Sequence, residues 1–266
     1  MKHISTTDIV RDSLTKQGLC QLDITILQTI YQFRLMTAQQ IQRLYFYNHP
    51  SILSAGRACN RTLYHLMKAK YLYQPERQIG GMRITSIPRT YALTTRGFRS
   101  LENNHRRHHR YEPGLLFLDH TLAIGDIYCD IVSYSRNKDW YISHIETEPS
   151  CWRPFNTLTG KSTILKPDLR IHLQLRNTEL SWFIEIDRAT SHKKAITTKL
   201  QTYLDYYLSG KEQLENNVFP RVIWVVPMVQ RHIWMEKIIS TFNHKIPGLF
   251  IVRTTESATH ELATFT

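Results

Sequence analysis

The sequence predicts a two-domain protein of mixed α+β and α/β class. The chain has 266 residues, about the length of two ordinary domains. A basic and imidazole run, His105–Arg110, followed by Tyr-Glu-Pro-Gly, divides it, because such a run does not pack into a core and Pro-Gly breaks regular structure. Helical spacing precedes the run, and strand patterns bracketed by helices follow it. We therefore expect a first domain over residues 1–112, a basic linker over 105–114 and a second domain over 113–266.

Three helices are predicted in the first domain. Asp23 is placed to cap a helix whose apolar residues recur at helical spacing. Thr37 is placed to cap a short helix over Ala38–Phe46. A third helix opens at Ser51, after a proline, and runs to about Lys70.

A hairpin follows these helices. Tyr71–Tyr73 and Thr90–Leu93 read as strands, with glycines at the tip, Gly80-Gly81, between them. Thr94 or Thr95 then caps a last short helix. Three helices followed by a hairpin is the order of a winged helix-turn-helix domain, in which the third helix is the recognition helix.

The third predicted helix has one apolar and one basic face. Cys59, Leu63, Leu66 and Met67 form its apolar stripe. The residues that we expect to meet DNA are Arg57, Asn60, Arg61, Tyr64, His65 and Lys68 on this helix, and Arg77, Arg83 and Arg89 on the hairpin. Recognition helices reach base edges, and basic hairpins meet phosphates or the minor groove. With a net charge of +12, the pattern favours double-stranded DNA as the partner. A merely solvated helix face and a protein-contacting winged helix are the alternatives.

After the linker the pattern is that of a mixed α/β sandwich. The expected elements are a helix over Leu115–Tyr134, strands over Trp140–Thr147, Pro167–Leu175 and Leu180–Asp187, a helix over Lys193–Leu208, a strand over Arg221–Met228, a helix over about Arg231–Phe242 and a strand over Leu249–Val252. The strand over 167–175 alternates strictly between apolar and polar residues. The strands over 180–187 and 221–228 are nearly all apolar, as central buried strands are.

Three acids stand at the ends of the predicted buried strands: Asp168, Glu185 and Asp187. Burying an unpaired charge is costly, so acids in such strands need a partner. Glu185 and Asp187 project from the same face of their strand, and a hairpin would bring Asp168 alongside. Three oxygen donors suit Mg²⁺ or Mn²⁺, which activates water and stabilises the charge that builds on a phosphate during hydrolysis. A structural set of ion pairs with Arg170 and Arg188 is the alternative.

The order Pro167-Asp168 and then Glu185-x-Asp187 resembles the PD-(D/E)xK nuclease superfamily. The resemblance implies that Asp168 and Glu185 are catalytic metal ligands, and it departs from the pattern at Asp187, which stands where the motif has its lysine. In that superfamily the lysine can move to the following helix, and the lysines available there are Lys193, Lys194 and Lys199. Lys199, one to two turns into the helix, is the substitute that we expect. The departure leaves open whether the site cleaves DNA or only retains the fold.

Short motifs in a fixed order extend the resemblance over most of the chain. They are Tyr91–Gly97, Asp119–Leu122, Lys166–Asp168, Phe183–Thr190 and Lys199–Tyr203. In this order they resemble the replication–relaxation family of plasmids and mobile elements. The resemblance implies a role in plasmid or mobile-element replication and DNA relaxation.

His120 lies in the second of these motifs, on the first helix of the second domain. The family pattern implies that His120 faces the acidic cluster, as a catalytic base or as a neighbour of the metal site. A core histidine bonded to a backbone carbonyl is the alternative.

Composition argues against several other classes. The longest apolar run, Val222–Val229, is too short to span a bilayer, and the first residues lack the apolar core of a signal peptide. The four cysteines lie far apart without a C-x-x-C pair, so neither zinc nor redox chemistry is indicated, and we expect free thiols in a cytoplasmic protein without membrane contact. Gly160-Lys161-Ser162 imitates a phosphate-binding loop, but Phe155 stands where its first glycine belongs.

Two functions follow from this sequence. The first is a DNA-binding, metal-dependent endonuclease or nickase, using Mg²⁺ or Mn²⁺, that acts in replication or DNA relaxation of a plasmid or mobile element. The second is a replication initiator or transcription factor without catalysis, whose nuclease-like domain mediates homodimer formation or contact with other replication or mobile-element proteins. The absence of the motif lysine favours the second function, and the three retained acids favour the first.

Overall fold

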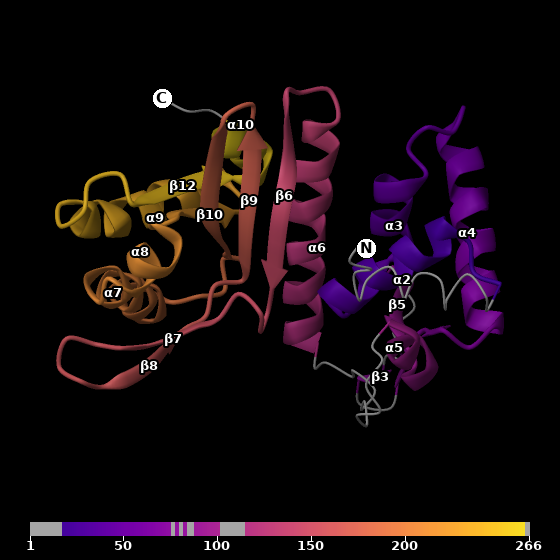
Figure 1. Cartoon of the computed structure of the whole chain (residues 1–266), viewed down its shortest axis with the longest axis horizontal. Helices are drawn as coiled ribbons and strands as arrows, with labels where there is room; N and C mark the ends of the chain where they lie inside the picture. Colours follow the sequence, from indigo (N-terminus) through magenta and orange to yellow (C-terminus); the bar gives the residue numbers. More distant parts are fainter. Residues whose placement is uncertain (1–17, 76–77, 80–81, 84–87, 102–114, 264–266) are drawn as a thin grey trace, which may run out of the picture. The chain divides into compact units, whose positions relative to one another are not determined.

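The computed structural model describes residues 18–75, 78–79, 82–83, 88–101 and 115–263, and it combines helices with several sheets (Figure 1). The chain divides into two compact units, Met1–Cys129 and Asp130–Thr266. The unit boundary lies within helix α6 (Leu115–Ser135). The predicted linker over 105–114 lies outside the described residues, and the predicted domain boundary at 112/113 stays a prediction.

Three helices open the described part of the first unit: α2 (Gln21–Phe33), α3 (Ala38–Tyr45) and α4 (Ile52–Lys68). The predicted cap of α3 is confirmed, because the Thr37 hydroxyl accepts from the Gln40 amide at 3.0 Å. The predicted cap of α2 is wrong by three residues. Cys20 is the N-cap, and Asp23, inside the first turn, accepts from the Cys20 amide at 3.0 Å. Such a carboxylate still satisfies one of the amides left open at the helix start.

The strands of the first unit form an antiparallel sheet with the order β1-β5-β2, made of β1 (Met36–Thr37), β5 (Thr90–Leu93) and β2 (Leu72–Tyr73). The predicted pairing of the segments around residues 72 and 92 is confirmed. A separate short hairpin, β3 (Gln78–Ile79) with β4 (Met82–Arg83), lies between β2 and β5 in the chain. Helix α5 (Thr95–Leu101) follows, and the Thr94 hydroxyl accepts from the Gly97 amide at 3.0 Å.

Two glycines permit close packing in this unit. A Cβ atom on Gly97 would lie 2.3 Å from the Tyr71 carbonyl oxygen, so only glycine allows α5 to approach β2 in this way. A Cβ atom on Gly125 of α6 would lie 2.9 Å from the Gln40 amide nitrogen. That nitrogen donates to the Leu122 carbonyl oxygen at 2.8 Å, which ties α3 to the first part of α6.

The second unit is built on a five-stranded sheet with the order β12-β11-β10-β9-β6. These strands are β6 (Trp140–Thr147), β9 (Leu169–Leu175), β10 (Thr178–Ile186), β11 (Arg221–Val226) and β12 (Phe250–Thr254). Strands β6, β9 and β10 pair antiparallel, whereas β10, β11 and β12 pair parallel. Each of the five strands lies within a few residues of its predicted position.

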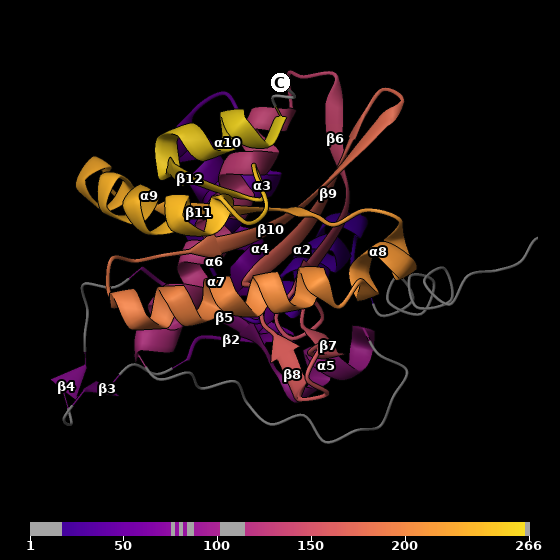
Figure 2. The same cartoon turned by 90° about the vertical axis from the view of Figure 1, so that its left-hand side faces the viewer.

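Helices α7 (Lys193–Leu208), α8 (Lys211–Asn216) and α9 (Val229–Asn243) lie on one side of this sheet (Figure 1). Phe183, Trp224 and Val252 of the sheet form one core with apolar residues of α7 and α9. Figure 2 shows α7 beside a second hairpin, β7 (Arg153–Asn156) with β8 (Ser162–Leu165). This hairpin, α8 and the last helix, α10 (Thr255–Ala263), were not predicted from the sequence. Within the described residues, no helix is long and apolar enough to cross a membrane.

Candidate functional site

Asp168 and Glu185 lie opposite each other on neighbouring strands. The antiparallel register pairs Ile184 with Leu169, so that Glu185 falls opposite Asp168 just before β9 begins. Facing residues on such strands have Cβ atoms only about 5 Å apart. The Asp168 Oδ2 atom accepts from the Ile186 amide at 2.7 Å, which fixes this carboxylate across the two strands. The hairpin that we expected to bring these two acids together is present.

Helix α7 directs a lysine and a tyrosine at the two carboxylates. The Lys199 ammonium contacts Glu185 Oε2 directly and lies 3.7 Å from Asp168 Oδ1. One turn later, the Tyr203 hydroxyl donates to Glu185 Oε1 at 2.5 Å. Residues four apart lie on one face of a helix, and the buried Leu200 and Leu204 hold this face against the sheet. Of the three lysines available on α7, the structure therefore brings Lys199 to the two carboxylates, whereas Lys193 and Lys194 are exposed.

Burial dominates the electrostatics of this group. It raises the pKa of Glu185 to about 8, with a further upward contribution from Asp168, although Lys199 acts in the opposite direction. Burial by itself would lower the pKa of Lys199, but the two carboxylates outweigh it and raise that pKa above its usual value. Burial thus favours the protonated form of Glu185, and the Lys199 ammonium lies close enough to compensate charge on both carboxylates.

Asp187, the third acid expected at the site, is held by a different cation. Arg231 of α9 donates to both carboxylate oxygens of Asp187, at 2.5 and 3.0 Å, and also to the Ser191 carbonyl oxygen at 2.6 Å. The Ala189 amide donates to Asp187 Oδ2 at 3.1 Å. Asp187 therefore anchors the segment between β10 and α7 to α9. A role for Asp187 as a third metal ligand stays a prediction.

The donor set at Lys199 fits a divalent cation that keeps much of its water shell. Among the described residues, no group of three or more His, Cys, Asp or Glu is arranged to hold a metal ion. One oxygen of Asp168 and one of Glu185 nevertheless face the same ammonium group. Mg²⁺ is commonly bound by only one or two carboxylates, with waters and substrate phosphates completing the octahedron. The two carboxylates therefore suit Mg²⁺ or Mn²⁺, which do not require a complete cage of protein ligands.

His120 lies half-buried on α6, in the part of that helix that belongs to the first unit, whereas the acids belong to the second unit. Whether His120 faces the acids stays a prediction. Arg170, considered above as a salt-bridge partner of the three acids, forms ion pairs with Glu146 and Glu212.

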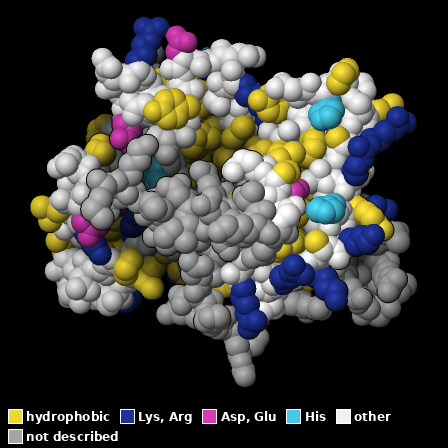
Figure 3. All heavy atoms as spheres, turned by 45° about the vertical axis from the view of Figure 1, so that its right-hand side comes forward, with side chains coloured by type: hydrophobic (Ala, Val, Ile, Leu, Met, Phe, Trp, Pro, Cys, Tyr) yellow, Lys and Arg dark blue, Asp and Glu magenta, His cyan; other side chains and the backbone are white. Residues whose placement is uncertain are grey.

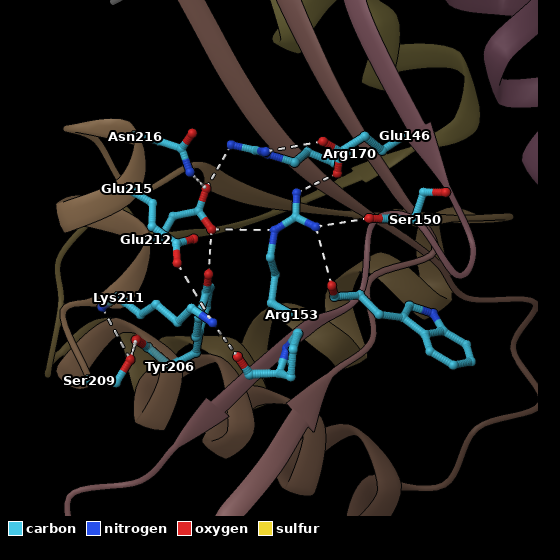
Figure 4. A network of polar contacts seen from close by, with 12 residues as sticks. Glu146, Ser150, Arg153, Arg170, Tyr206, Ser209, Lys211, Glu212, Glu215 and Asn216 are labelled. Carbon is cyan, nitrogen blue, oxygen red and sulfur yellow. Dashed lines mark hydrogen bonds and ion pairs between the residues drawn. The ribbon is translucent and has the colours of Figure 1, made fainter.

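Arg170 belongs to a buried network that sequence reasoning missed (Figure 4). Its guanidinium lies 2.7 Å from Glu212 of α8, a residue with no exposed surface, and 3.4 Å from Glu146 of β6. Arg153 of β7 contacts the same two carboxylates, and the Tyr206 hydroxyl donates to Glu212. Two carboxylates and two guanidinium groups compensate each other there, so the network joins sheet, hairpin and α8 without net charge.

The outward face of α4 carries the side chains expected to meet DNA. Its predicted contact residues are all exposed: Arg57, Asn60, Arg61, Tyr64, His65 and Lys68. Between Asp23 and Glu102 the chain has eleven Lys and Arg residues and a single acid, Glu76. Figure 3, which brings the side bearing α4 forward, shows dark-blue Lys and Arg side chains gathered on its right-hand part with few magenta acids among them.

The predicted hairpin contacts are only partly described. Arg89, directly before β5, is exposed, and its carbonyl oxygen accepts from the Ala38 amide at 3.1 Å. Arg77 lies outside the described residues, and Arg83 lies in β4 with a side chain that is not described. Phosphate or minor-groove contact by these three arginines stays a prediction.

Two residues that shape the site were not assigned a role from sequence. Tyr203 is buried, and its hydroxyl orients Glu185. The spacing of four residues between Lys199 and Tyr203 is the signal that could have revealed this. Arg231 of α9 lies far from Asp187 in sequence, and no local pattern links the two.

Of the comparisons with known proteins, the one with family models supports the family that the motifs resemble. No curated protein and no solved structure matches the chain. The model of the replication-relaxation family matches residues 27–222, which include α4, both carboxylates and Lys199. The matched segment covers most of the chain and indicates a function related to replication. The chain belongs to the replication-relaxation family.

Proposed function

We propose that this chain is a DNA-binding protein of a plasmid or another mobile element that cleaves phosphodiester bonds of DNA with Mg²⁺ or Mn²⁺. The first unit would hold the duplex and the second unit would carry the reaction. The observation that carries the proposal is the meeting of Asp168, Glu185 and Lys199 at the junction of β9, β10 and α7.

The element order supports a winged helix in the first unit. Helix α2, strand β1, helices α3 and α4 and then the strands β2 and β5 follow each other in the chain, and the three strands form one small sheet. In such a domain the third helix enters the major groove. The exposed basic face of α4 is the surface that this interpretation requires.

The second unit supports a nuclease-like interpretation in the same way. Three antiparallel strands, a helix and a parallel strand form the framework, and the two acids lie on the second and third of these strands or next to them. Lys199 on the following helix supplies the ammonium group that the motif lacks at position 187. Because likeness of fold does not establish a reaction, the proposal rests on the residues at the site.

Asp168 and Glu185 are the residues that would hold the metal ion. When bound, such an ion activates a water molecule and stabilises the developing charge on the phosphate. Lys199 would place a positive charge beside the scissile phosphate, where it would also stabilise the negative charge that develops on the phosphate. Tyr203 holds the Glu185 carboxylate in one orientation through its hydroxyl.

The test uses the full chain and supercoiled plasmid in the presence of Mg²⁺ or Mn²⁺, with products separated on a gel. We expect wild-type protein to nick or linearise the plasmid, and Asp168→Asn and Glu185→Gln to leave it intact. The matched control is Glu179→Gln, the same substitution at a largely exposed position of β10. A second readout is melting: Mn²⁺ should raise the Tm of wild type and of the control, but not that of Glu185→Gln.

Asp187→Asn separates the two roles open to that residue. As a third metal ligand it would be required for both cleavage and the Mn²⁺-dependent rise in Tm. As the partner of Arg231 it would be required for stability, while cleavage by the folded protein persists.

A second candidate function is a replication or transcription factor without catalysis. The observation that favours it is the ammonium group of Lys199 already lying against both carboxylates, so that a cation is not needed to compensate them. If wild-type protein leaves the plasmid intact and its Tm does not respond to Mn²⁺, the catalytic proposal fails and this one stands.

A further inference from the structure

The first turn of α4 presents an apolar side chain on an otherwise basic and polar face. Leu53 is 74% exposed, and Ile52 beside it is 84% exposed. From Leu53, the residues Arg57, Asn60 and Tyr64 follow at i+4, i+7 and i+11, so all four lie along one line of the helix. Ile52 lies about 100° away around the helix axis. Leu53 therefore shares its direction with the proposed DNA contacts.

The position of this turn is fixed by hydrogen bonds. The Ser51 hydroxyl accepts from the Ser54 amide at 3.1 Å and caps the helix. The Gln42 side chain of α3 donates to the Ile52 carbonyl oxygen at 3.2 Å. The start of α4 is thus held against α3, and Leu53 extends from a rigid support instead of a loop.

We propose that Leu53 contacts the 5-methyl group of a thymine in the major groove, so that α4 selects a site containing thymine at that position. The inference rests on the proposed binding of DNA by α4. The N-terminal residues of a recognition helix are those that reach base edges. The thymine methyl is the apolar group that the major groove offers, and the neighbouring Arg57 and Asn60 are of the types that pair with guanine and adenine. Leu53, Arg57 and Asn60 would therefore place contacts for thymine, guanine and adenine along one line of α4.

The experiment first selects preferred duplexes from a random pool with the full chain. Each thymine of the selected site is then replaced in turn by uracil, which lacks only the methyl group. We expect one replacement to weaken binding by wild-type protein about fourfold, the change that burial of one methyl group gives. Leu53→Ala should bind the thymine and uracil duplexes equally. The matched control, Ile52→Ala, should keep the wild-type response to uracil.

Each other outcome overturns the inference. If the selected site lacks thymine, if no uracil replacement weakens binding, or if Leu53→Ala keeps the response, Leu53 does not read a methyl group, while DNA binding by α4 stands. If Leu53→Ala changes the sedimentation of the protein and leaves discrimination unchanged, Leu53 belongs to a protein contact. If wild-type protein binds no duplex, the proposed function fails together with this inference.

Discussion

On α4, Arg57, Arg61 and Lys68 lie exposed in a stretch of chain almost without acids, whereas the buried Arg170 and the half-buried Arg153 of the second unit are paired with carboxylates. Both regions are rich in cations, but the cations have different surroundings. Exposed charges keep mobile counterions, which a phosphate backbone can replace with a gain in entropy. The charges of a buried pair have lost their water shells and are compensated by each other, so they are not available to a phosphate backbone.

Exposed arginines of this kind are available to a polyanionic partner, whereas the paired arginines of the second unit hold the fold together. Residue type and local charge do not distinguish them, because arginines of both kinds stand in amphipathic elements. The distribution of acids does: the stretch from Ile24 to Gln74 has none, while Glu146 and Glu212 reach Arg170 from distant parts of the chain.

The largest expected effect is that of Arg170→Ala on stability. The substitution leaves Glu212, which has no exposed surface, with one guanidinium partner fewer, and breaking a buried pair in this way costs about 3–5 kcal/mol. Urea unfolding measures the loss. The control is Arg176→Ala, whose pair with Asp139 is 82% exposed on both sides and should contribute at most about 1 kcal/mol. Equal losses in the two variants would contradict the distinction between buried and exposed pairs.

The second prediction concerns pH. Because burial raises the pKa of Glu185 from 4.5 to about 8, the folded protein holds a proton that the unfolded chain has released between these values. The stability that this group contributes is therefore lost as the pH rises from about 5 to 8. In EDTA, the Tm of wild type should fall over this range more steeply than that of Glu185→Gln. Parallel curves for the two proteins would show that Glu185 does not carry the proton.

The third prediction concerns a single exposed arginine. Arg61→Ala should weaken binding to the selected duplex by about 1–3 kcal/mol and relax the preference for one base. Its side chain is exposed, so the Tm should stay within the error of measurement. Arg176→Ala, an exposed arginine of the second unit, is the control and should leave affinity unchanged. Equal losses of affinity in both variants would mean that charge alone, and not α4, determines binding.

Local signals predicted the elements of this fold well. Alternation and apolar runs located all five strands of the large sheet, and Thr37 and Thr94 accept hydrogen bonds at the starts of α3 and α5, as their residue type favours. The hairpin β7–β8 was missed because its segments have only four residues each, with a proline inside one of them and polar residues around the turn. Asp23 was misplaced because an aspartate is equally suited to the cap and to the first turn.

The candidate site was predictable only in part. Asp168 and Glu185 follow from the strand pattern together with the hairpin between them, and helix position singled out Lys199. The pairing of Asp187 with Arg231, and of Arg170 with Glu212, joins residues about forty positions apart. Such contacts depend on how helices pack on the sheet, which no short window of sequence records.

The smallest effect is expected for Arg89→Ala. Arg89 is exposed, and its carbonyl oxygen is bonded to the first amide of α3, so the side chain extends from the sheet side of the first unit and not from α4. An arginine in this place would contact phosphate, and phosphates carry no base identity. Its removal should therefore weaken binding to all duplexes equally and lower the slope of log affinity against log salt by about one. Titrations at several salt concentrations, with the selected duplex and a scrambled one, measure both quantities. Arg61→Ala, measured in parallel, should affect the selected duplex more than the scrambled one. If Arg89→Ala also weakens binding to the two duplexes unequally, Arg89 contacts bases. Base contacts would then not be confined to α4, and phosphate contacts would not be confined to the strands of the first unit.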